Sequence, residues 1–313
     1  MDPGYGLAPG SAQTATTGRS AADHRGWHHP GVLALALALG SSLCWGVSDF
    51  AGGLLARRVP LAAVMLVSQA VGLAGIALIV AAAGATAPAG TELLPAAIAG
   101  AAGAFALSAF YRALAVGTMS IVAPISATGV AVPVAFGVAG GDRPGAVQVV
   151  GMAVAVAGVV LASREPGAEV DAQEARHARR SIALALLAAL GFGTFFVGMD
   201  AAAEANVFWA LLIARSASVG VLVIGVAVLR PSLRTDRRSF AVLAGVGGLD
   251  LLANTCFALA STHGLLSLVS VAGSLYPVAT VLLARAVLGE RVSRGQEAGI
   301  VLALAGVALI AAG

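Results

Sequence analysis

The chain contains the tripeptide Gly141-Asp142-Arg143 and, about 148 residues later, the similar tripeptide Gly289-Glu290-Arg291. The same residues follow each copy at the same spacing: Gln148, Gly151, Gly158 and Leu161 after the first, and Gln296, Gly299, Gly306 and Leu309 after the second. Each copy ends one long apolar run and opens another, so the repeated unit is a pair of membrane helices joined by a charged turn. Two copies of one apolar helical unit are typical of transporters with a central site between the copies.

The composition excludes the soluble classes of protein. Mean hydropathy is +0.93 and charged residues make up 11% of the chain, against roughly 25% in soluble domains. The arginines fall in short loops rather than on one basic face, so no nucleic-acid partner is expected. Cys44 and Cys256 lie inside apolar runs and form no disulfide or metal-ligand pattern. We expect no cofactor and no metal.

Windows of about 20 residues, the length that crosses a bilayer, predict an all-α integral membrane protein with ten transmembrane helices. The spans are 31–55, 60–83, 93–115, 119–139, 145–163, 181–200, 207–229, 239–261, 265–288 and 295–312.

The ten spans divide into two units of five. Residues 31–163 form the first five-helix repeat, 164–180 a charged linker loop, and 181–313 the second repeat, while 1–30 read as a disordered tail. His24, His28 and His29 in that tail are interpreted as surface residues rather than metal ligands. Because five is odd, the second repeat crosses the membrane in the opposite sense, which predicts two inverted repeats.

Several short motifs, taken together, resemble one family. An aromatic-Gly pair opens each half (Trp45-Gly46 and Phe192-Gly193), Tyr111-Arg112-Ala113-Leu114 closes the third span, and the charged turn precedes the last helix. This order is similar to that of the EamA family of the drug/metabolite transporter superfamily. The resemblance implies a secondary transporter, often an exporter of small metabolites, with a central cavity. It also implies an Arg in the second helix of a repeat, where this chain has Arg215 in one half and Ser68-Gln69 in the other.

Ionisable residues inside spans are costly in hydrocarbon and therefore face protein or water. Asp250 lies near the middle of the eighth span with Asn254 on the same face, and Arg215 lies in the seventh. We expect Arg215 and Asp250 to be partners, either as a midplane anion or proton site or as a buried ion pair that joins two helices.

A second group lies toward one end of the first half. Trp45, Ser48 and Asp49 share nearly one face of the first span, which favours a cavity role in recognising a cationic or aromatic solute. Tyr111 and Arg112 end the third span on the same side, so that Asp49 and Arg112 are predicted to be able to meet. For Tyr111 and Arg112, anchoring at the membrane interface is the slightly favoured interpretation.

The remaining candidates complete the list of site residues. Gln69, Phe192 and Tyr276 are candidates for solute binding. Pro124, Pro133 and Pro277 interrupt the fourth and ninth spans, where broken helices either contact substrate or serve packing. Glycines seven residues apart in the fifth and tenth spans predict close packing of helices.

The predicted function is secondary transport of a small organic metabolite or drug-like solute by alternating access in the cell (inner or plasma) membrane, with export as the expected direction. The alternatives are an intramembrane hydrolase and a non-transporting scaffold. Gly247-Gly248-Leu249-Asp250 lacks the spacing of a membrane aspartyl protease, no Gly-x-Ser-x-Gly elbow is present, and no Walker loop is present. Bilayer lipid and the solute are the expected partners, and a homodimer is left open.

The side of the membrane on which the termini lie is also left open. Twelve arginines fall in loops opposite the termini and three fall on the termini side. The positive-inside rule therefore places the termini outside, whereas the family resemblance implies termini in the cytoplasm.

Overall fold

The computed structural model describes residues 30–116, 122, 125–162, 172–288 and 294–312, and helices account for nearly all of these ranges. Several features discussed above lie outside the described residues. They are His24, His28 and His29, Pro124, the first part of the predicted linker, and the second tripeptide Gly289-Glu290-Arg291.

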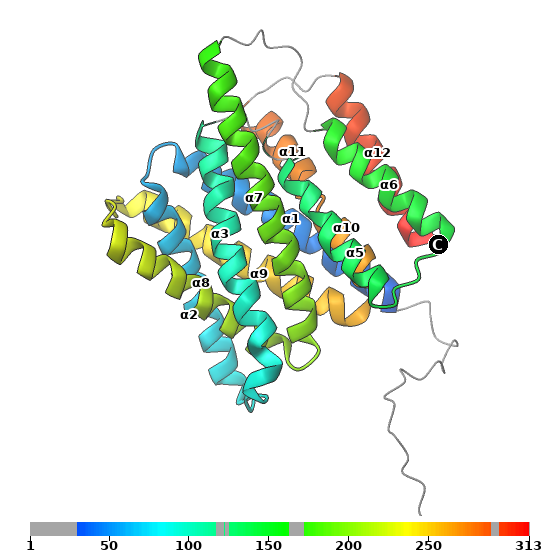
Figure 1. Cartoon of the computed structure of the whole chain (residues 1–313), viewed down its shortest axis with the longest axis horizontal. Coiled ribbons are helices and arrows are strands. Elements are labelled where there is room, and N and C mark those ends of the chain that lie inside the picture. The colour runs from blue at the N-terminus through cyan, green and yellow to red at the C-terminus, as the bar shows by residue number, and fades with distance from the viewer. Residues whose placement is uncertain (1–29, 117–121, 123–124, 163–171, 289–293, 313) are drawn as a thin grey trace, which may run out of the picture.

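The helices are coloured in chain order in Figure 1. The first half contributes α1 (Pro30–Ala56), α2 (Leu61–Ala83), η1 (Gly90–Leu93), α3 (Leu94–Val116), η2 (Thr128–Val130), α5 (Ala131–Ala139) and α6 (Ala146–Ala162). The second half contributes α7 (Ala172–Ala203), α8 (Val207–Leu229), α9 (Arg237–His263), α10 (Leu266–Gly273), α11 (Tyr276–Leu288) and α12 (Arg294–Ala312).

Six helices in the described residues are long and apolar enough to cross a membrane: α1, α2, η1 with α3, the part of α7 from Arg180 onward, α8 and α9. The segments predicted as the fourth, fifth, ninth and tenth spans contain shorter apolar helices. Helix α7 begins at Ala172, so its first turns occupy residues predicted as linker loop.

Two of the shorter segments are interrupted a few residues before a proline. The predicted ninth span breaks at Ser274 and Leu275, between α10 and α11, and the fourth tightens into the 3-10 helix η2 before α5. Proline has no amide hydrogen, so Pro277 cannot bond the carbonyl of Gly273, nor Pro133 that of Gly129, four residues earlier. Both prolines then lie in the first turn of the next helix, where the missing donor costs nothing.

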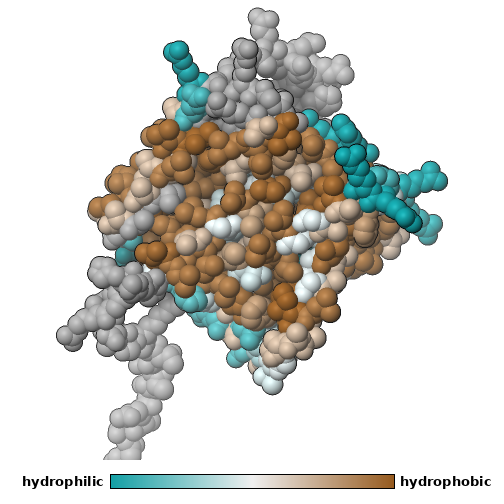
Figure 2. Space-filling view, turned by 180° about the vertical axis from the view of Figure 1, so that it is seen from behind, coloured by the Kyte–Doolittle hydropathy of each residue, from teal (hydrophilic) through white to brown (hydrophobic). Residues whose placement is uncertain are grey.

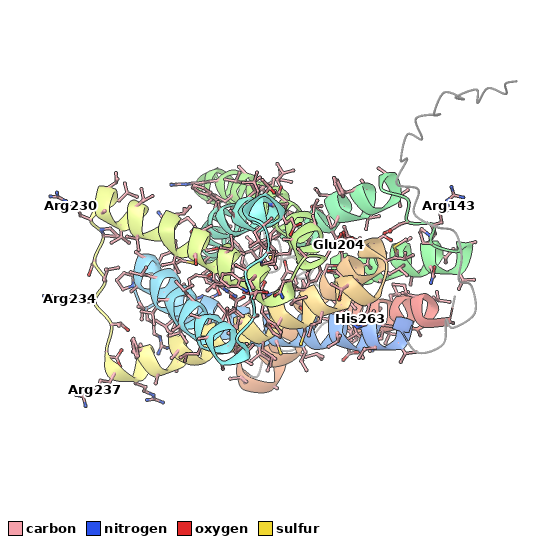
Figure 3. The ribbon with its side chains drawn as sticks, turned by 90° about the horizontal axis from the view of Figure 1, so that it is seen from below. Arg143, Glu204, Arg230, Arg234, Arg237 and His263 are labelled. Carbon is pink, nitrogen blue, oxygen red and sulfur yellow. The ribbon has the colours of Figure 1, made fainter. Side chains whose placement is uncertain are left out.

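Apolar side chains cover much of the outer surface, and polar ones gather toward its edges (Figure 2). The largest exposed hydrophobic residues include Leu78, Leu190 and Val228. At one end of the molecule lie Arg230, Arg234 and Arg237, and Arg143 lies at the opposite end (Figure 3). Such a distribution fits an apolar band facing lipid with charged ends in water.

The two halves are interleaved rather than side by side. Helix α1 packs against α9 and α3 packs against α7, so the first helix of each half lies along the third helix of the other. In addition, α2 packs on α8, and α6 packs on α12 at one edge of the molecule (Figure 1).

Individual contacts recur with a shift of 147 residues. A Cβ atom placed on Gly46 of α1 would lie 2.8 Å from the carbonyl oxygen of Tyr276, and one on Gly193 of α7 would lie 2.6 Å from that of Gly129. Gly46 and Gly193 are the glycines of the two aromatic-Gly pairs. Each of them therefore lets a backbone at a helix break approach closely from the opposite half.

The glycines of α6 and α12 pack these two helices together, as predicted. A Cβ atom on Gly151 would meet the carbonyl of Gly306, one on Gly158 would meet the backbone of Ala303, and one on Gly306 would meet Ala155. These glycines let the two helix backbones approach closely.

The close approach at Gly46 makes a specific substitution destabilising. Gly46→Ala forces the new methyl group against Tyr276 and Ala279, and we expect it to lower stability by about 1–3 kcal/mol, the usual cost of overpacking. Gly220→Ala is the matched control, since nothing lies within 4 Å of a Cβ there and Ala favours helix by roughly 1 kcal/mol over Gly. Thermal unfolding of the purified variants measures the difference. Equal melting temperatures for the two variants would contradict the packing described here.

Candidate functional site: a central cavity between the halves

A central cavity lies between the two halves and has about 840 Å³ of empty space, counting its open side. It draws side chains from α1, α2, α3, α7, α8 and α9 and from both interrupted segments. Eight of the eleven predicted site residues line it: Trp45, Asp49, Gln69, Phe192, Arg215, Asp250, Asn254 and Tyr276.

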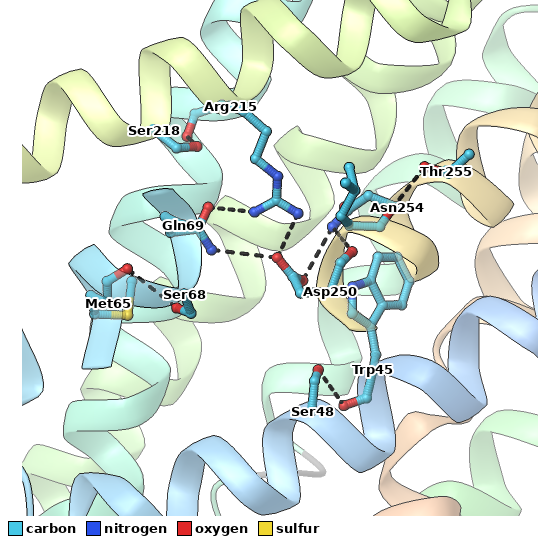
Figure 4. Close-up of polar contacts among 12 residues, drawn as sticks. Trp45, Ser48, Met65, Ser68, Gln69, Arg215, Ser218, Asp250, Asn254 and Thr255 are labelled. Carbon is cyan, nitrogen blue, oxygen red and sulfur yellow. Dashed lines mark hydrogen bonds and ion pairs between the residues drawn. The ribbon is translucent and has the colours of Figure 1, made fainter. Parts of the chain in front are cut away.

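The predicted partnership of Arg215 and Asp250 forms in the structure (Figure 4). The Nη2 atom of Arg215 lies 2.5 Å from Oδ2 of Asp250, and the two side chains are 7% and 16% exposed. Arg215 Nη1 also donates to Oε1 of Gln69 at 2.5 Å. The guanidinium therefore spans two acceptors that come from α2 and α9.

Two amides complete the surroundings of the Asp250 carboxylate. Nε2 of Gln69 donates to Oδ2 at 3.4 Å, and Nδ2 of Asn254 donates to Oδ1 at 3.1 Å. Asn254 also donates to the backbone carbonyl of Asp250 at 2.6 Å. Burial of an ion pair is tolerated when further hydrogen bonds satisfy its remaining groups, and Gln69 and Asn254 meet that condition.

Asp49 has a different neighbour from the one expected. Its Oδ1 accepts a hydrogen bond from the Tyr111 hydroxyl at 3.4 Å, while Arg112 is exposed, so the Asp49–Arg112 contact does not form in the described structure. The interpretation of Tyr111 as an interfacial anchor is also wrong, because this side chain is only 2% exposed. Sequence spacing had indicated similar depth for Asp49 and Arg112 but not the direction in which α3 turns each side chain.

Ser48 lies beside the site without reaching it. Its hydroxyl donates to the backbone carbonyl of Trp45 at 3.1 Å, within α1, and the residue does not contribute to the cavity lining. Ser218 of α8 has a structural role of the same kind across a helix pair, since it donates to the carbonyl of Gly100 at 2.6 Å.

Aromatic rings form much of the apolar wall. The ring centroid of Trp45 lies 5.5 Å from that of Phe196 and 5.9 Å from that of Phe257, and Phe192 meets Phe110 at 5.8 Å. The Trp45–Phe257 pair and the Phe192–Phe110 pair are counterparts in the two halves. Trp45 and Phe192 are 147 residues apart, and so are Phe110 and Phe257. Contacts at these separations are typical of attractive aromatic pairs.

Sequence reasoning missed several residues of the lining. Phe195 and Phe196 follow the predicted Phe192 on α7, and Ser274 lies in the break before Pro277. Phe196 is 147 residues beyond Asp49, so the repeat itself contained the signal. Tyr276 was predicted, and its hydroxyl is buried without a hydrogen-bond partner in the described structure.

No three His, Cys, Asp or Glu side chains lie together in a way that could hold a metal ion within the ranges that the structure describes.

The fold agrees with comparisons to known proteins. Residues 179–312 match the sequence model of the EamA-like transporter family. The family prediction made from the aromatic-Gly pairs and charged turns is thus confirmed over these residues. A multi-pass membrane protein with several apolar helices is what this family leads one to expect, and its members are transporters.

A solved structure supports the fold over most of the length. A crystal structure described only as that of a protein superimposes with a TM-score of 0.71 at 17% sequence identity, covering 88% of this chain and 95% of that one. At such low identity the likeness concerns the fold alone. A comparison with curated proteins finds no match.

The buried ion pair leads to a double-substitution prediction. Arg215→Ala and Asp250→Ala should each destabilise the protein by about 3–5 kcal/mol, because each leaves an uncompensated charge among apolar helices. The double variant should recover much of that loss, since no unpaired charge remains. Monodisperse yield and thermal unfolding in detergent report both effects. Losses that simply add would show that Arg215 and Asp250 act separately.

Proposed function

We propose that the protein is a secondary transporter that moves a small organic solute across the cell membrane by alternating access. The observation that carries this proposal is the central cavity, which both halves line and whose described lining includes the acidic and basic side chains of Asp49, Arg215 and Asp250. Intramembrane ionisable residues facing a cavity mark substrate or ion pathways. Membership of residues 179–312 in a transporter family supports the same conclusion.

We further propose that ten membrane helices form two inverted five-helix repeats, 31–163 and 181–313. Support comes from the exchanged pairing of α1 with α9 and of α3 with α7, and from the counterpart contacts of Gly46 and Gly193. An odd number of helices per repeat inverts the second copy, and rocking of one repeat against the other exposes a central site alternately to each side.

The energy source in this proposal is a proton gradient or the gradient of the solute itself. A P-loop requires a lysine that reaches the nucleotide phosphates, and the sequence contains no lysine at all. Export is the proposed direction, in keeping with the family resemblance.

Thiol labelling offers a direct test of one of the ten proposed spans, α8. In a variant with Cys44 and Cys256 replaced by Ser, single cysteines are introduced as Ala205→Cys, after α7, and Ser232→Cys, after α8, both at exposed positions. Because one helix separates them, a membrane-impermeant thiol reagent on intact cells should label only one of the two. Labelling of both positions would contradict a membrane-spanning α8.

Transport itself is tested by comparing metabolites inside and outside cells with and without the protein. We expect at least one small organic solute to change its distribution without any change in its mass. The change should be lost in Asp49→Asn, which alters the cavity, and kept in Asp236→Asn, which alters an exposed helix cap that Asn can also form.

The two alternatives give different results in the same experiment. A hydrolase would generate new product masses, and a scaffold would leave solute distribution unchanged. Either result would replace the transporter proposal.

A further inference from the structure

The charges that line the cavity do not cancel. In the described structure, Asp49, Arg215 and Asp250 are the charged side chains of the lining. Arg215 and Asp250 form an ion pair, and the Asp250 carboxylate is further satisfied by Gln69 and Asn254. One negative charge, that of Asp49, is left without a cationic partner.

The Asp49 carboxylate has accepting capacity to spare. Two carboxylate oxygens offer about four acceptor positions, and the hydrogen bond that the structure gives to this group is a long one, 3.4 Å from the Tyr111 hydroxyl. Arg112, which follows Tyr111 in the sequence, is exposed. The Asp49 carboxylate therefore lies in the cavity lining with no cationic side chain paired to it in the described structure.

A second polar group in the lining also lacks a partner. The hydroxyl of Tyr276 is buried and makes no hydrogen bond within the described residues, although the side chain lines the same cavity as Asp49. Leaving such a group unpaired is unfavourable. A ligand with a hydrogen-bonding group next to its charge would satisfy both Asp49 and Tyr276.

The rest of the wall suits the apolar part of such a ligand. Trp45 lies one helical turn before Asp49 on α1, and Phe192 and Phe196 lie one turn apart on α7. The faces of aromatic rings attract cations, most strongly when water is excluded. They repel the negative charge of an anion for the same reason.

We propose that the cavity selects small organic cations that carry an ammonium N–H, with Asp49 as their counter-charge, Tyr276 as a second polar contact, and Trp45, Phe192 and Phe196 around the apolar body. This inference rests on the proposed transport function and names the solute class. The Arg215–Asp250 pair is left to hold α8 and α9 together, and it adds no net charge to the site.

Equilibrium binding tests the inference directly. The purified full chain in lipid nanodiscs is titrated by calorimetry with 2-phenylethylammonium and n-hexylammonium, and with two probes matched to the first, the neutral 3-phenylpropan-1-ol and the anionic 3-phenylpropanoate. We expect an ammonium probe to bind at least tenfold more tightly than either matched probe, since only the cation compensates Asp49.

Variants assign the recognition to named side chains. Asp49→Asn keeps the shape but removes the charge, and we expect it to weaken ammonium binding about thirtyfold or more. Tyr276→Phe should weaken it about fivefold, the effect of one neutral hydrogen bond. Asp236→Asn is the matched acid-to-amide control outside the cavity and should bind as the parent does. Each variant is first checked for a monodisperse elution profile and an unchanged melting temperature.

Three outcomes would overturn the inference: binding of neither ammonium probe, binding of the alcohol or the carboxylate as tightly as the cation, or unchanged ammonium affinity in well-folded Asp49→Asn. Uptake of the same probes into proteoliposomes separates this inference from the proposed function. Asp49-dependent ammonium binding without any uptake would refute transport and leave the cation site standing. Uptake of the neutral or anionic probe in preference to the cation would refute the cation site and leave the transport proposal standing.

Discussion

Close approach of helix backbones across the two halves is the constraint on which the rest of the structure depends. Lipid tails are as apolar as the side chains, so helices in a membrane associate through van der Waals packing rather than through exclusion of water. Gly100 of α3 lies against the carbonyl of Ala214, and Gly247 of α9 lies against the carbonyl of Ser68. These two contacts fix α8 and α2 against helices of the opposite half, with glycine at each closest point.

The position of the buried arginine follows from those contacts. Arg215 and Gln69 each come directly after a residue whose carbonyl meets a glycine, so packing brings the two side chains together. Gly72, one turn beyond Gln69 on α2, leaves space for the guanidinium, because a Cβ there would lie 3.3 Å from Nε of Arg215. Arginine suits this place better than lysine, since its planar fork can reach the Gln69 amide and the Asp250 carboxylate at once.

Sequence reasoning was most successful where a physical cost left few choices. A charge in an apolar span must be compensated, and this alone indicated that Arg215 and Asp250 are partners. The repeated glycines of α6 and α12 likewise predicted a close helix pair. The prediction for Asp49 and Arg112 was wrong because hydropathy gives the depth of a residue but not its rotation about the helix. The exact position of each helix break could not be predicted from the sequence. It depends on how the backbone bends around the carbonyl that lies four residues before a proline.

Counterpart positions in the two halves give the cavity a shape that is more symmetric than its chemistry. Five pairs of residues 147 apart line it: Trp45 and Phe192, Asp49 and Phe196, Gly103 and Asp250, Leu107 and Asn254, and Ala127 and Ser274. One pair is aromatic in both halves, whereas each of the other four has a polar side chain in one half and an apolar residue in the other. Similar backbones in both halves are what allow two conformations of comparable stability, one open to each side. In the proposed cation site, unlike side chains at the same positions would give the solute one preferred orientation, because Asp49 has Phe196 as its counterpart in the other half. In the proposed alternating-access cycle, the side to which the cavity opens would change while the contacts of the bound solute stay the same.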